Sequence, residues 1–372
     1  MLISFKRCYI LEANYGLFQS HKLIKGEENG EIFYLEVPKK LQKNYFTRNF
    51  YFISIAILRG LKIFKKGAID AIYSPTTDPI ELWPTYILHL IKGTEFLVFS
   101  HNQMEIQVEH PYIFFRDYER YGIIHSLFWS VAEFISHFIL KRALGVFTPS
   151  DVGCRYLEKI GLGKEAIFRT NSFIDDETIS FHESLKKYDF VVLARIIPRK
   201  NLNTIIEALS LSNSSSDKAI TMALITPTSG TVLNEFKRLI SSKGLSDAVE
   251  IILNASEDRK LEVLDHSRIY VSLSLDESFP TSNLEASARG LAMLLSDIPA
   301  HKSIYKDAAI FVNPQNTAEI AKIMTYLVNN VDEVNQLSEL SFKVSKLYKR
   351  SVVLNSEIRW IKERYEKRRV NR

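Results

Sequence analysis

Two carboxylates and a predicted helix start share the stretch DESFPTSNLEASARG, residues 276–290. Glu277 lies in a loop before the helix, and Glu285 follows with seven residues between them. The first N–H groups of a helix attract anions, while carboxylates accept hydrogen bonds from hydroxyl groups. The stretch therefore favours a phosphate at a helix N-terminus with a carboxylate on each side for hydroxyls. A structural alternative stays open, in which Ser282 caps the helix and Glu285 returns to the cap N–H.

Two cations flank a second loop, ARIIPRKN, residues 194–201. Arg195 follows a predicted strand and Lys200 precedes a predicted helix, a pattern typical of a diphosphate site. The forked donor of arginine and the compact charge of lysine complement the partial positive charge of the helix end. Arg199 could replace either neighbour, and a solvated basic loop is the competing interpretation.

A histidine, His101, follows the apolar run TEFLVFS, residues 94–100. A run with almost no polar interior residue is typical of a buried parallel strand. His101 would lie at the carboxyl end of that strand and face a ligand cleft, although most single histidines are structural or exposed.

These segments need a scaffold that gathers strand ends, and alternating apolar and amphipathic stretches predict one. Strands are expected within 6–13, 30–37, 68–75, 94–102 and 144–150, and then within 189–196, 219–226, 249–253, 268–274, 291–296 and 308–313. Helices between them imply two parallel sheets of the doubly wound type, one in each half. The candidate residues lie beyond the carboxyl ends of these strands, where such sheets bind ligands.

Composition places the chain among globular proteins and limits its partners. The 372 residues are 46% hydrophobic with a formal net charge of +5, which suits an anionic substrate or membrane surface. Cys8 and Cys154 show no metal-like spacing and favour a reducing compartment. The start lacks a signal-peptide pattern, and the apolar stretch 122–140 contains Glu133, which favours a buried or half-buried helix over a membrane span.

The second half also resembles a known family. The stretch 275–316 is similar to the donor-site region of the retaining GT-B glycosyltransferases of family GT4, with two spaced glutamates, an aromatic residue, a Gly or Pro, and a later Ser/Asp–Pro turn. The matching positions are Glu277, Phe279, Pro280, Glu285, Ala286, Gly290, Ser296, Asp297 and Pro299. Residues 191–209 look like the family's phosphate-binding segment, and the resemblance covers roughly 140–316.

The resemblance implies how the chain would hold the diphosphate of a nucleoside diphosphate sugar. Arg195 and Lys200 would neutralise its charge. Backbone N–H groups of Phe279 and Thr281 and around Pro280, which itself has no N–H, would bind its oxygens.

The resemblance also implies roles around the sugar and the nucleoside. Glu277 would be catalytic and contact the transferred sugar, and His101 would reach that sugar from the first domain as a second catalytic residue. Glu285 would accept hydrogen bonds from the ribose. Asn254 and Ala255 would lie against the base.

Two loops depart from the family pattern. The first, EANYGLFQ at 12–19, contains only Gly16, which is therefore the one candidate glycine contact to donor or acceptor there. The second, ITPTSG at 225–230, replaces a glycine-rich turn of the second domain. These departures concern the acceptor position and the nucleotide preference.

For the whole chain the resemblance implies a GT-B fold, in which two Rossmann-like doubly wound domains face a cleft and a C-terminal helix crosses back to the first domain. The expected domains are 1–175 for the acceptor, 176–350 for the nucleotide-sugar donor, and 351–372 for the C-terminal helix and basic tail. The implied activity moves a sugar from a nucleoside diphosphate sugar to a glycan or lipid-linked acceptor, with retention and without a metal or cofactor. No D-x-D pair occurs in the sequence, which agrees with that expectation.

Other functions stay open or are disfavoured. A catalytically inactive GT-B scaffold that binds a nucleotide sugar or glycan is the main alternative, and a phosphorylase or sugar-nucleotide epimerase on the same fold is another. An oxidoreductase is disfavoured because no G-x-G-x-x-G follows a strand. Nucleic-acid binding is disfavoured because the charge excess is small.

Basic and aromatic residues of the first half predict a membrane contact. The stretch 51–67 places Arg59, Lys62, Lys65 and Lys66 beside apolar residues, and 110–122 adds aromatic side chains. Such a surface suits the bilayer interface, so we expect a cytoplasmic protein with peripheral attachment to the inner face of the membrane. The competing interpretation packs these residues into the domain core.

Overall fold

The computed structural model describes residues 8–13, 30–35, 45–67, 69–100, 108, 123–181, 185–216, 218–277 and 279–370, with the backbone alone for 8–13, 30–35, 45–46 and 124–125. The chain divides into two compact units. Unit 1 contains residues 1–170 and 354–372, and unit 2 contains residues 171–353. The sequence predicts boundaries after residues 175 and 350, and assigns the C-terminal helix to a segment of its own.

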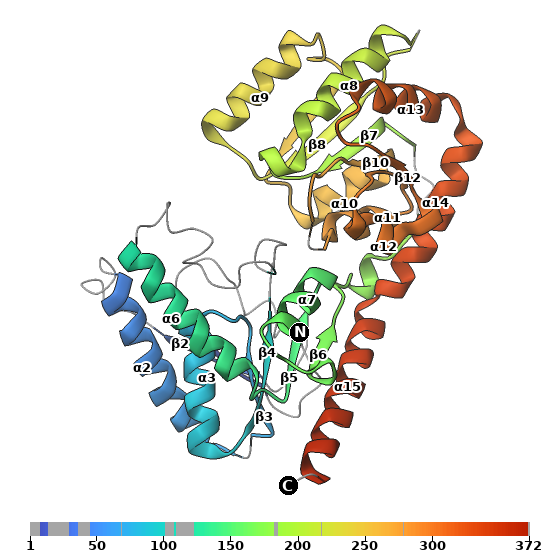
Figure 1. The fold of residues 1–372 in the computed structure, drawn as a ribbon. Helices are drawn as coiled ribbons and strands as arrows, with labels where there is room; N and C mark the ends of the chain where they lie inside the picture. Colours follow the sequence, from blue (N-terminus) through green and yellow to red (C-terminus); the bar gives the residue numbers. More distant parts are fainter. Residues whose placement is uncertain are drawn as a thin grey trace. The chain divides into compact units, whose positions relative to one another are not determined.

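Unit 1 is built on parallel strands with helices between them (Figure 1). Its main sheet has the order β3-β4-β5-β6, and β1 and β2 form a separate parallel pair. The strands are β1 (Cys8–Ala13), β2 (Gly30–Leu35), β3 (Ala71–Ser74), β4 (Glu95–Phe99), β5 (Gly145–Thr148) and β6 (Ile167–Arg169). The helices are α2 (Tyr45–Ile63), α3 (Pro79–Lys92), α6 (Ile123–Leu140), α7 (Asp151–Lys159), the short η2 (Lys164–Ala166) and most of α15 (Arg350–Val370).

Local signals set the ends of these helices, as α3 shows. Asp78 caps the helix by accepting a hydrogen bond from the Ile80 N–H at 3.0 Å, and Pro79 occupies the first helical position. Gly93 ends the helix in the left-handed region, with φ of 65°.

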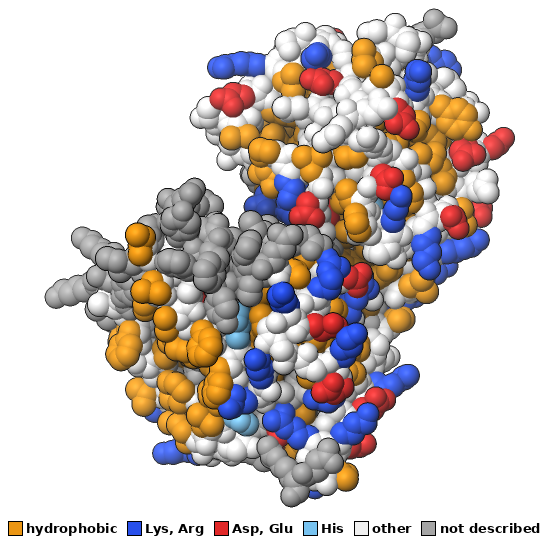
Figure 2. Space-filling view, viewed as in Figure 1, with side chains coloured by type: hydrophobic (Ala, Val, Ile, Leu, Met, Phe, Trp, Pro, Cys, Tyr) orange, Lys and Arg blue, Asp and Glu red, His pale blue; other side chains and the backbone are white. Residues whose placement is uncertain are grey.

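Helix α6 is half-buried, which falls within the prediction for 122–140, but its outward half is apolar. Hydrophobic side chains gather on the visible face of unit 1 over α2 and α6 (Figure 2). Among the helices of the described residues, none has the length and apolar character needed to cross a membrane. The outward apolar face of α6 is exposed.

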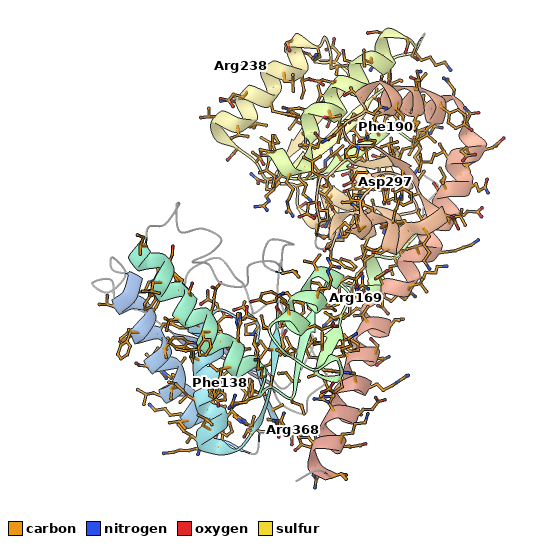
Figure 3. The ribbon with its side chains drawn as sticks, in the orientation of Figure 1. Phe138, Arg169, Phe190, Arg238, Asp297 and Arg368 are labelled. Atoms are coloured by element: carbon orange, nitrogen blue, oxygen red, sulfur yellow. The ribbon has the colours of Figure 1, made fainter. Side chains whose placement is uncertain are left out.

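The C-terminal helix α15 returns to unit 1, as predicted. Its Trp360 ring lies 5.3 Å from that of Phe147 and 5.1 Å from that of Phe168, measured between ring centroids. Near the end of the helix, Arg368 donates a hydrogen bond to the Arg142 carbonyl at 3.0 Å (Figure 3). The side chains of α15 thus complete the core beside β5 and β6.

Unit 2 contains one parallel sheet with the order β12-β11-β10-β7-β8-β9. Its strands are β7 (Tyr188–Leu193), β8 (Met222–Thr226), β9 (Val249–Leu253), β10 (Ser267–Ser272), β11 (Ala292–Ser296) and β12 (Ile310–Val312). Its helices are α8 (Leu202–Ser214), α9 (Gly230–Ser242), α10 (Glu257–Asp265), α11 (Thr281–Ala288), α12 (Pro299–Tyr305), α13 (Thr317–Asn329) and α14 (Val331–Ser345), with short turns η3 (Asp176–Thr178), η4 (Pro198–Lys200), η5 (Lys306–Ala308) and η6 (Lys346–Tyr348). The chain runs outward from β7 to β9 and then restarts on the other side of β7, so the topological switch point lies between β7 and β10.

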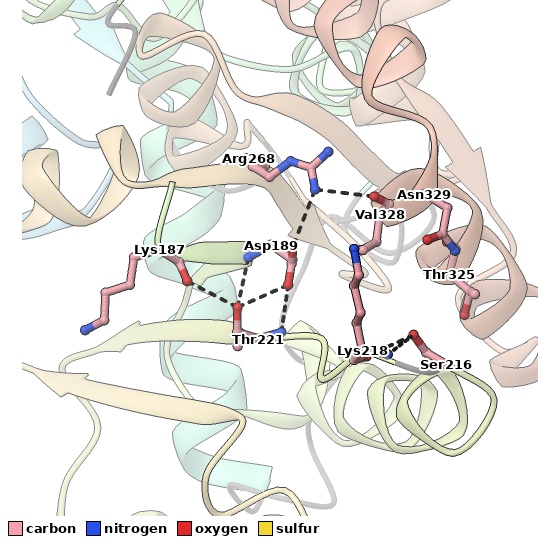
Figure 4. A network of polar contacts seen from close by, with 9 residues as sticks. All are labelled: Lys187, Asp189, Ser216, Lys218, Thr221, Arg268, Thr325, Val328 and Asn329. Carbon is pink, nitrogen blue, oxygen red and sulfur yellow. Dashed lines mark hydrogen bonds and ion pairs between the residues drawn. The ribbon is translucent and has the colours of Figure 1, made fainter. Parts of the chain in front are cut away.

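A polar network lies at the amino-terminal ends of the strands of this sheet. At the amino-terminal edge, Asp189 accepts hydrogen bonds from the N–H and hydroxyl of Thr221 at 2.9 and 3.1 Å (Figure 4). Arg268 joins Asp189 and the Val328 carbonyl, each at 3.4 Å. These contacts link the starts of adjacent strands and fix the sheet at that end, whereas ligands of such sheets bind at the carboxyl ends of the strands.

The predicted fold class is confirmed. Each unit has parallel strands joined through helices, the doubly wound arrangement that the strand spacing and the resemblance imply.

Candidate functional site

The candidate site of unit 2 is formed by two loops at the switch point. One loop follows β7 and contains Arg199 and Lys200, and the other follows β10 and contains Leu275 and Glu277. The Leu275 N–H donates a hydrogen bond to the Arg199 carbonyl at 2.9 Å, which ties the loops together. Parallel strands of this type bind ligands beside such a junction.

A buried ion pair joins the two loops. Lys200 Nζ contacts Glu277 Oε1, and the Arg199 guanidinium lies 4.0 Å from Glu277 Oε2. The Glu277 side chain is 7% exposed and that of Lys200 is 16% exposed, whereas that of Arg199 is 42% exposed. Since water screens the Lys200–Glu277 pair only weakly, each charge strongly fixes the position of the other.

A series of hydrogen bonds connects the Glu277 carboxylate to the ends of β10 and β11. The Ser274 hydroxyl donates to Glu277 Oε1 at 2.7 Å, and the Ser296 hydroxyl donates to the Ser274 carbonyl at 2.6 Å. His301 Nδ1 lies 3.0 Å from the Ser296 carbonyl, so the proton is on Nδ1 and Nε2 is an acceptor. Burial lowers the pKa of His301 to about 4, and the charges of Glu277 and Lys200 act on the ring in opposite directions.

Helix α11 begins at Thr281, directly after Phe279 and Pro280. Pro280 is the N-cap residue, and its side chain has no hydrogen-bonding atom to cap the helix. The Thr281 N–H, a predicted phosphate donor, is hydrogen-bonded to the Phe279 carbonyl at 3.1 Å. The Phe279 ring packs against Tyr348, with ring centroids 5.9 Å apart. A phosphate would thus have to displace the Thr281–Phe279 bond to use this donor.

The capping-box interpretation of the sequence is wrong. Ser282 lies inside α11, and its hydroxyl accepts a hydrogen bond from the Tyr270 hydroxyl at 3.0 Å. Glu285 turns away from the cap to pair with Lys260 of α10 at 2.9 Å. The helix begins two residues earlier than the capping pattern requires, with Pro280 rather than Ser282 at the N-cap position.

Glu285 and the Asn254 loop lie on neighbouring elements. Asn254 and Ala255 follow β9 and lead into α10, which carries Lys260. Asn254 is exposed, with φ of 48°, and Ala255 packs partly against the core. Burial acts to lower the pKa of Lys260, but Glu285 and Glu257 outweigh it and raise the pKa above its ordinary value. Lys260 stays charged and holds the Glu285 carboxylate in place.

The structure brings together only some of the predicted residues. Lys200 and Glu277 are in contact, and Arg195 lies in the same loop with an exposed side chain that makes no hydrogen bond or ion pair with the described residues. His101 and Gly16 lie outside the described residues, as does the whole of 110–122.

Several residues around the site were not predicted as site residues, although Ser296 was a matching position of the family resemblance. They are Ser274, Ser296, His301, Lys260 and the fully buried Asn283, whose side-chain amide atoms find no hydrogen-bond partner among the described residues. A polar side chain in the first turn of α11 and a histidine just after the Ser/Asp–Pro turn were the only local signals for Asn283 and His301. Ser296 was marked only by its place in that turn. For Ser274 and Lys260, the contacts depend on strand order and leave no pattern in the sequence.

The described residues hold no cluster of three or more His, Cys, Asp or Glu side chains that could bind a metal ion. The charges that face the site come instead from lysine, arginine and the two glutamates.

Sequence comparison places this site within a known family. Residues 175–344, which include the Lys200–Glu277 pair and the start of α11, match the family model Glycosyl transferases group 1. Unit 2 therefore contains a match to the group 1 glycosyltransferases over most of its length. The serotype-specific mannosyltransferase WbdA of Escherichia coli is 29% identical over 198 residues, covering 50% of this chain and 24% of WbdA. A GDP-mannose:cellobiosyl-diphosphopolyprenol alpha-mannosyltransferase of Xanthomonas oryzae is 30% identical over 66 residues, covering 18% of this chain and 17% of that protein.

Those matches cover about a quarter or less of the curated relatives' length, whereas similar solved structures extend over nearly the whole chain. A glycosyltransferase from Rickettsia africae has a TM-score of 0.71 at 15% identity, covering 97% of this chain and 99% of its own. The Anabaena protein HepE in complex with UDP-glucose has a TM-score of 0.66 at 14% identity, covering 93% and 88%. These similarities identify the fold as GT-B, as the sequence predicts.

Proposed function

We propose that the chain transfers a sugar from a nucleoside diphosphate sugar to a glycan or lipid-linked acceptor. The observation that carries this proposal is the Lys200–Glu277 pair at the switch point of the donor unit, beside the start of α11. Lysine neutralises phosphate and a carboxylate binds sugar hydroxyls, so one pair can address both halves of a nucleotide sugar. The family match of residues 175–344 supports the same conclusion.

In the proposed reaction, the bond between the anomeric carbon and the diphosphate oxygen breaks while an acceptor hydroxyl oxygen bonds to the anomeric carbon. Negative charge grows on the leaving diphosphate, and Lys200, Arg199 and Arg195 would stabilise it without a metal ion. Positive charge grows on the sugar, and Glu277 would stabilise that charge. The departing phosphate oxygen would take the acceptor proton, since attack on the vacated face leaves it nearby and retains the anomeric configuration.

Glu277 must exchange partners for this to happen. In the structure it neutralises Lys200, the group that a diphosphate would need. When the diphosphate arrives, Lys200 would turn to it and Glu277 would be freed for the sugar. Ser274, Ser296 and His301 are proposed as positioning residues that keep the loop in place during this exchange.

Further roles are assigned by position. Glu285, held by Lys260, would bind the ribose, and the exposed Asn254 with Ala255 would lie by the base. His101 would act on the sugar and Gly16 would contact donor or acceptor, as the family resemblance implies. A lipid-linked acceptor would be met at the inner face of the membrane.

The test is a binding and turnover panel of nucleoside diphosphate sugars with the full chain. The panel includes GDP-mannose and UDP-glucose, which the names of the relatives and of the HepE complex mention. We expect one donor to bind and to be hydrolysed slowly without acceptor, at a rate that a metal chelator leaves unchanged. Failure of every donor to bind would reject the function, and binding without hydrolysis or transfer would favour the inactive scaffold.

A further inference from the structure

Helix α6 exposes a continuous apolar stripe. Five side chains at a spacing of three or four residues are each about half exposed or more: Ile123 66%, Leu127 56%, Val131 53%, Phe134 62% and Phe138 47%. That spacing keeps them on one face of the helix. The neighbouring helices add Phe50 and Leu58 of α2 and Leu90 and Ile91 of α3, all more than half exposed. An exposed apolar area of this kind marks an interaction surface.

The stripe belongs to a helix whose other face is firmly packed. Ala132, Ile139 and Leu140 are buried, and the Trp83 indole donates a hydrogen bond to the Ser136 hydroxyl at 3.3 Å. His137 Nε2 lies 2.8 Å from the Tyr156 hydroxyl. Since these contacts fix the helix orientation, the outward stripe is a fixed feature of unit 1.

Cations gather at one end of this surface. Each of α2, α3 and α6 leads into a strand of the same parallel arrangement, so their carboxyl ends point to the same edge of unit 1. Exposed cations stand at or just beyond those ends: Lys62 and Lys65, Lys92, and Lys141 and Arg142. The apolar area of unit 1 in Figure 2 accordingly has Lys and Arg side chains below it.

One of these cations touches the stripe itself. The Arg142 guanidinium lies 3.3 Å from the centre of the Phe138 ring and donates to the Phe138 carbonyl at 3.0 Å. An aromatic ring with an arginine over it suits a boundary between an apolar and an anionic phase. The sequence of α6 contains one acidic residue, Glu133, and that of α2 contains none. A second copy of this face would therefore offer few counter-charges, whereas anionic lipid headgroups offer many.

We propose that this surface, defined by the α6 stripe with Phe50, Leu58, Leu90 and Ile91 and the cations at its end, docks the protein onto an anionic lipid bilayer. The α6 stripe would enter the headgroup boundary and lie along it, and Lys62, Lys65, Lys92, Lys141 and Arg142 would contact the lipid phosphates. The inference rests on the proposed function in one respect, because a lipid-linked acceptor would explain why the protein binds the membrane.

Vesicle flotation of the full chain tests the proposal. We expect the protein to float with phosphatidylcholine vesicles that contain phosphatidylglycerol, much less with phosphatidylcholine alone, and less as salt rises. Replacing Val131 and Phe134 together by serine should lower the vesicle-bound to free ratio by about tenfold or more. The matched control is Val331→Ser on α14 of unit 2, where Val331 is 54% exposed, and it should float like the wild type.

A second variant tests the cations at the end of the surface. Lys62→Gln with Lys65→Gln should reduce flotation and flatten its salt dependence, whereas Lys237→Gln on α9 should do neither. Leu127→Ser provides a second apolar variant in case the double variant unfolds, which circular dichroism would reveal. No flotation with anionic vesicles at low salt, or a dimer in sedimentation that Phe134→Ser dissociates without any vesicle binding, overturns the proposal.

Donor binding separates this inference from the proposed function. The surface variants should bind the nucleotide sugar as the wild type does, because the surface lies in unit 1 and the donor site in unit 2. Loss of flotation with intact donor binding would overturn only the membrane surface. Flotation without binding of any donor would overturn only the proposed function.

Discussion

Units 1 and 2 share a parallel sheet with intervening helices, but they differ in where their unusual residues lie. In unit 2 the charged and polar site residues Lys200, Glu277 and His301 lie close together at a strand junction. Unit 1 presents an apolar helix face, with cations at one end. The small charged ligand proposed for unit 2 requires a few groups at fixed distances. The extended surface proposed for unit 1 requires only a suitable composition.

The largest expected effect tests the proposed donor site at Glu277. Glu277→Gln should lower turnover about a thousandfold, or about 4 kcal/mol in the barrier, because the charge opposite the developing positive sugar is lost. Donor affinity should stay within a few-fold, since Lys200 is released for the phosphate. Asp276→Asn, next door and exposed, is the control. Full turnover in Glu277→Gln would remove Glu277 from the catalytic machinery.

The next effect concerns Lys200. Lys200→Ala should weaken donor binding about a hundredfold, or about 2.7 kcal/mol, because a charge-assisted contact to the diphosphate is lost and Glu277 is left buried without its partner. Isothermal titration with the donor measures this change. Lys141→Ala in unit 1 should bind donor normally, and equal losses in both variants would mean that the two units are not separate in function.

A smaller effect tests how unit 1 is completed. Trp360→Ala should destabilise unit 1 by about 2 kcal/mol, because the ring that packs on Phe147 and Phe168 is removed. Thermal melting with hydrogen exchange should show earlier opening of β5 and β6 and normal protection in β7 and β10. Equal loss of protection in both units would contradict their independence.

The smallest effect is one that the units should share. Burial lowers the pKa of both His137 in unit 1 and His301 in unit 2 to about 4 from an ordinary 6.5. A lowered histidine pKa means that the unfolded chain binds the proton first, so stability is full above pH 6.5 and falls as the pH drops toward 4. At pH 5.5 each histidine should lower the free energy of unfolding by roughly 1 kcal/mol. Melting curves above pH 6.5 and at pH 5.5 measure the loss of stability on acidification. That loss should be smaller in His137→Gln or in His301→Gln than in the wild type, and an unchanged loss in both variants would refute this account.

The parts that could be predicted from the sequence were those with local signals. Strand and helix alternation predicted both sheets, and the positions of Lys200 and Glu277 after strand ends predicted that both belong to one ligand site. Their direct contact, across 77 residues of sequence, was not predicted. The partner of Glu285 could not be predicted, since Lys260 lies 25 residues away on another helix and a capping pattern competed for the same residue. The exposure of α6 depends on which neighbours cover it, and periodicity alone identifies a helix without deciding that.

The path of the chain through unit 1 has a consequence for its synthesis. Residues 354–370 supply the Trp360 ring for Phe147 and Phe168 and the Glu357 carboxylate that accepts a hydrogen bond from the Thr170 hydroxyl. A ribosome delivers those residues only after all of unit 2, so unit 2 can close first although it starts later. Until then the nascent first half lacks part of its core while its apolar α6 face is already formed, which makes this interval the one in which a chaperone or the membrane itself would have most to bind.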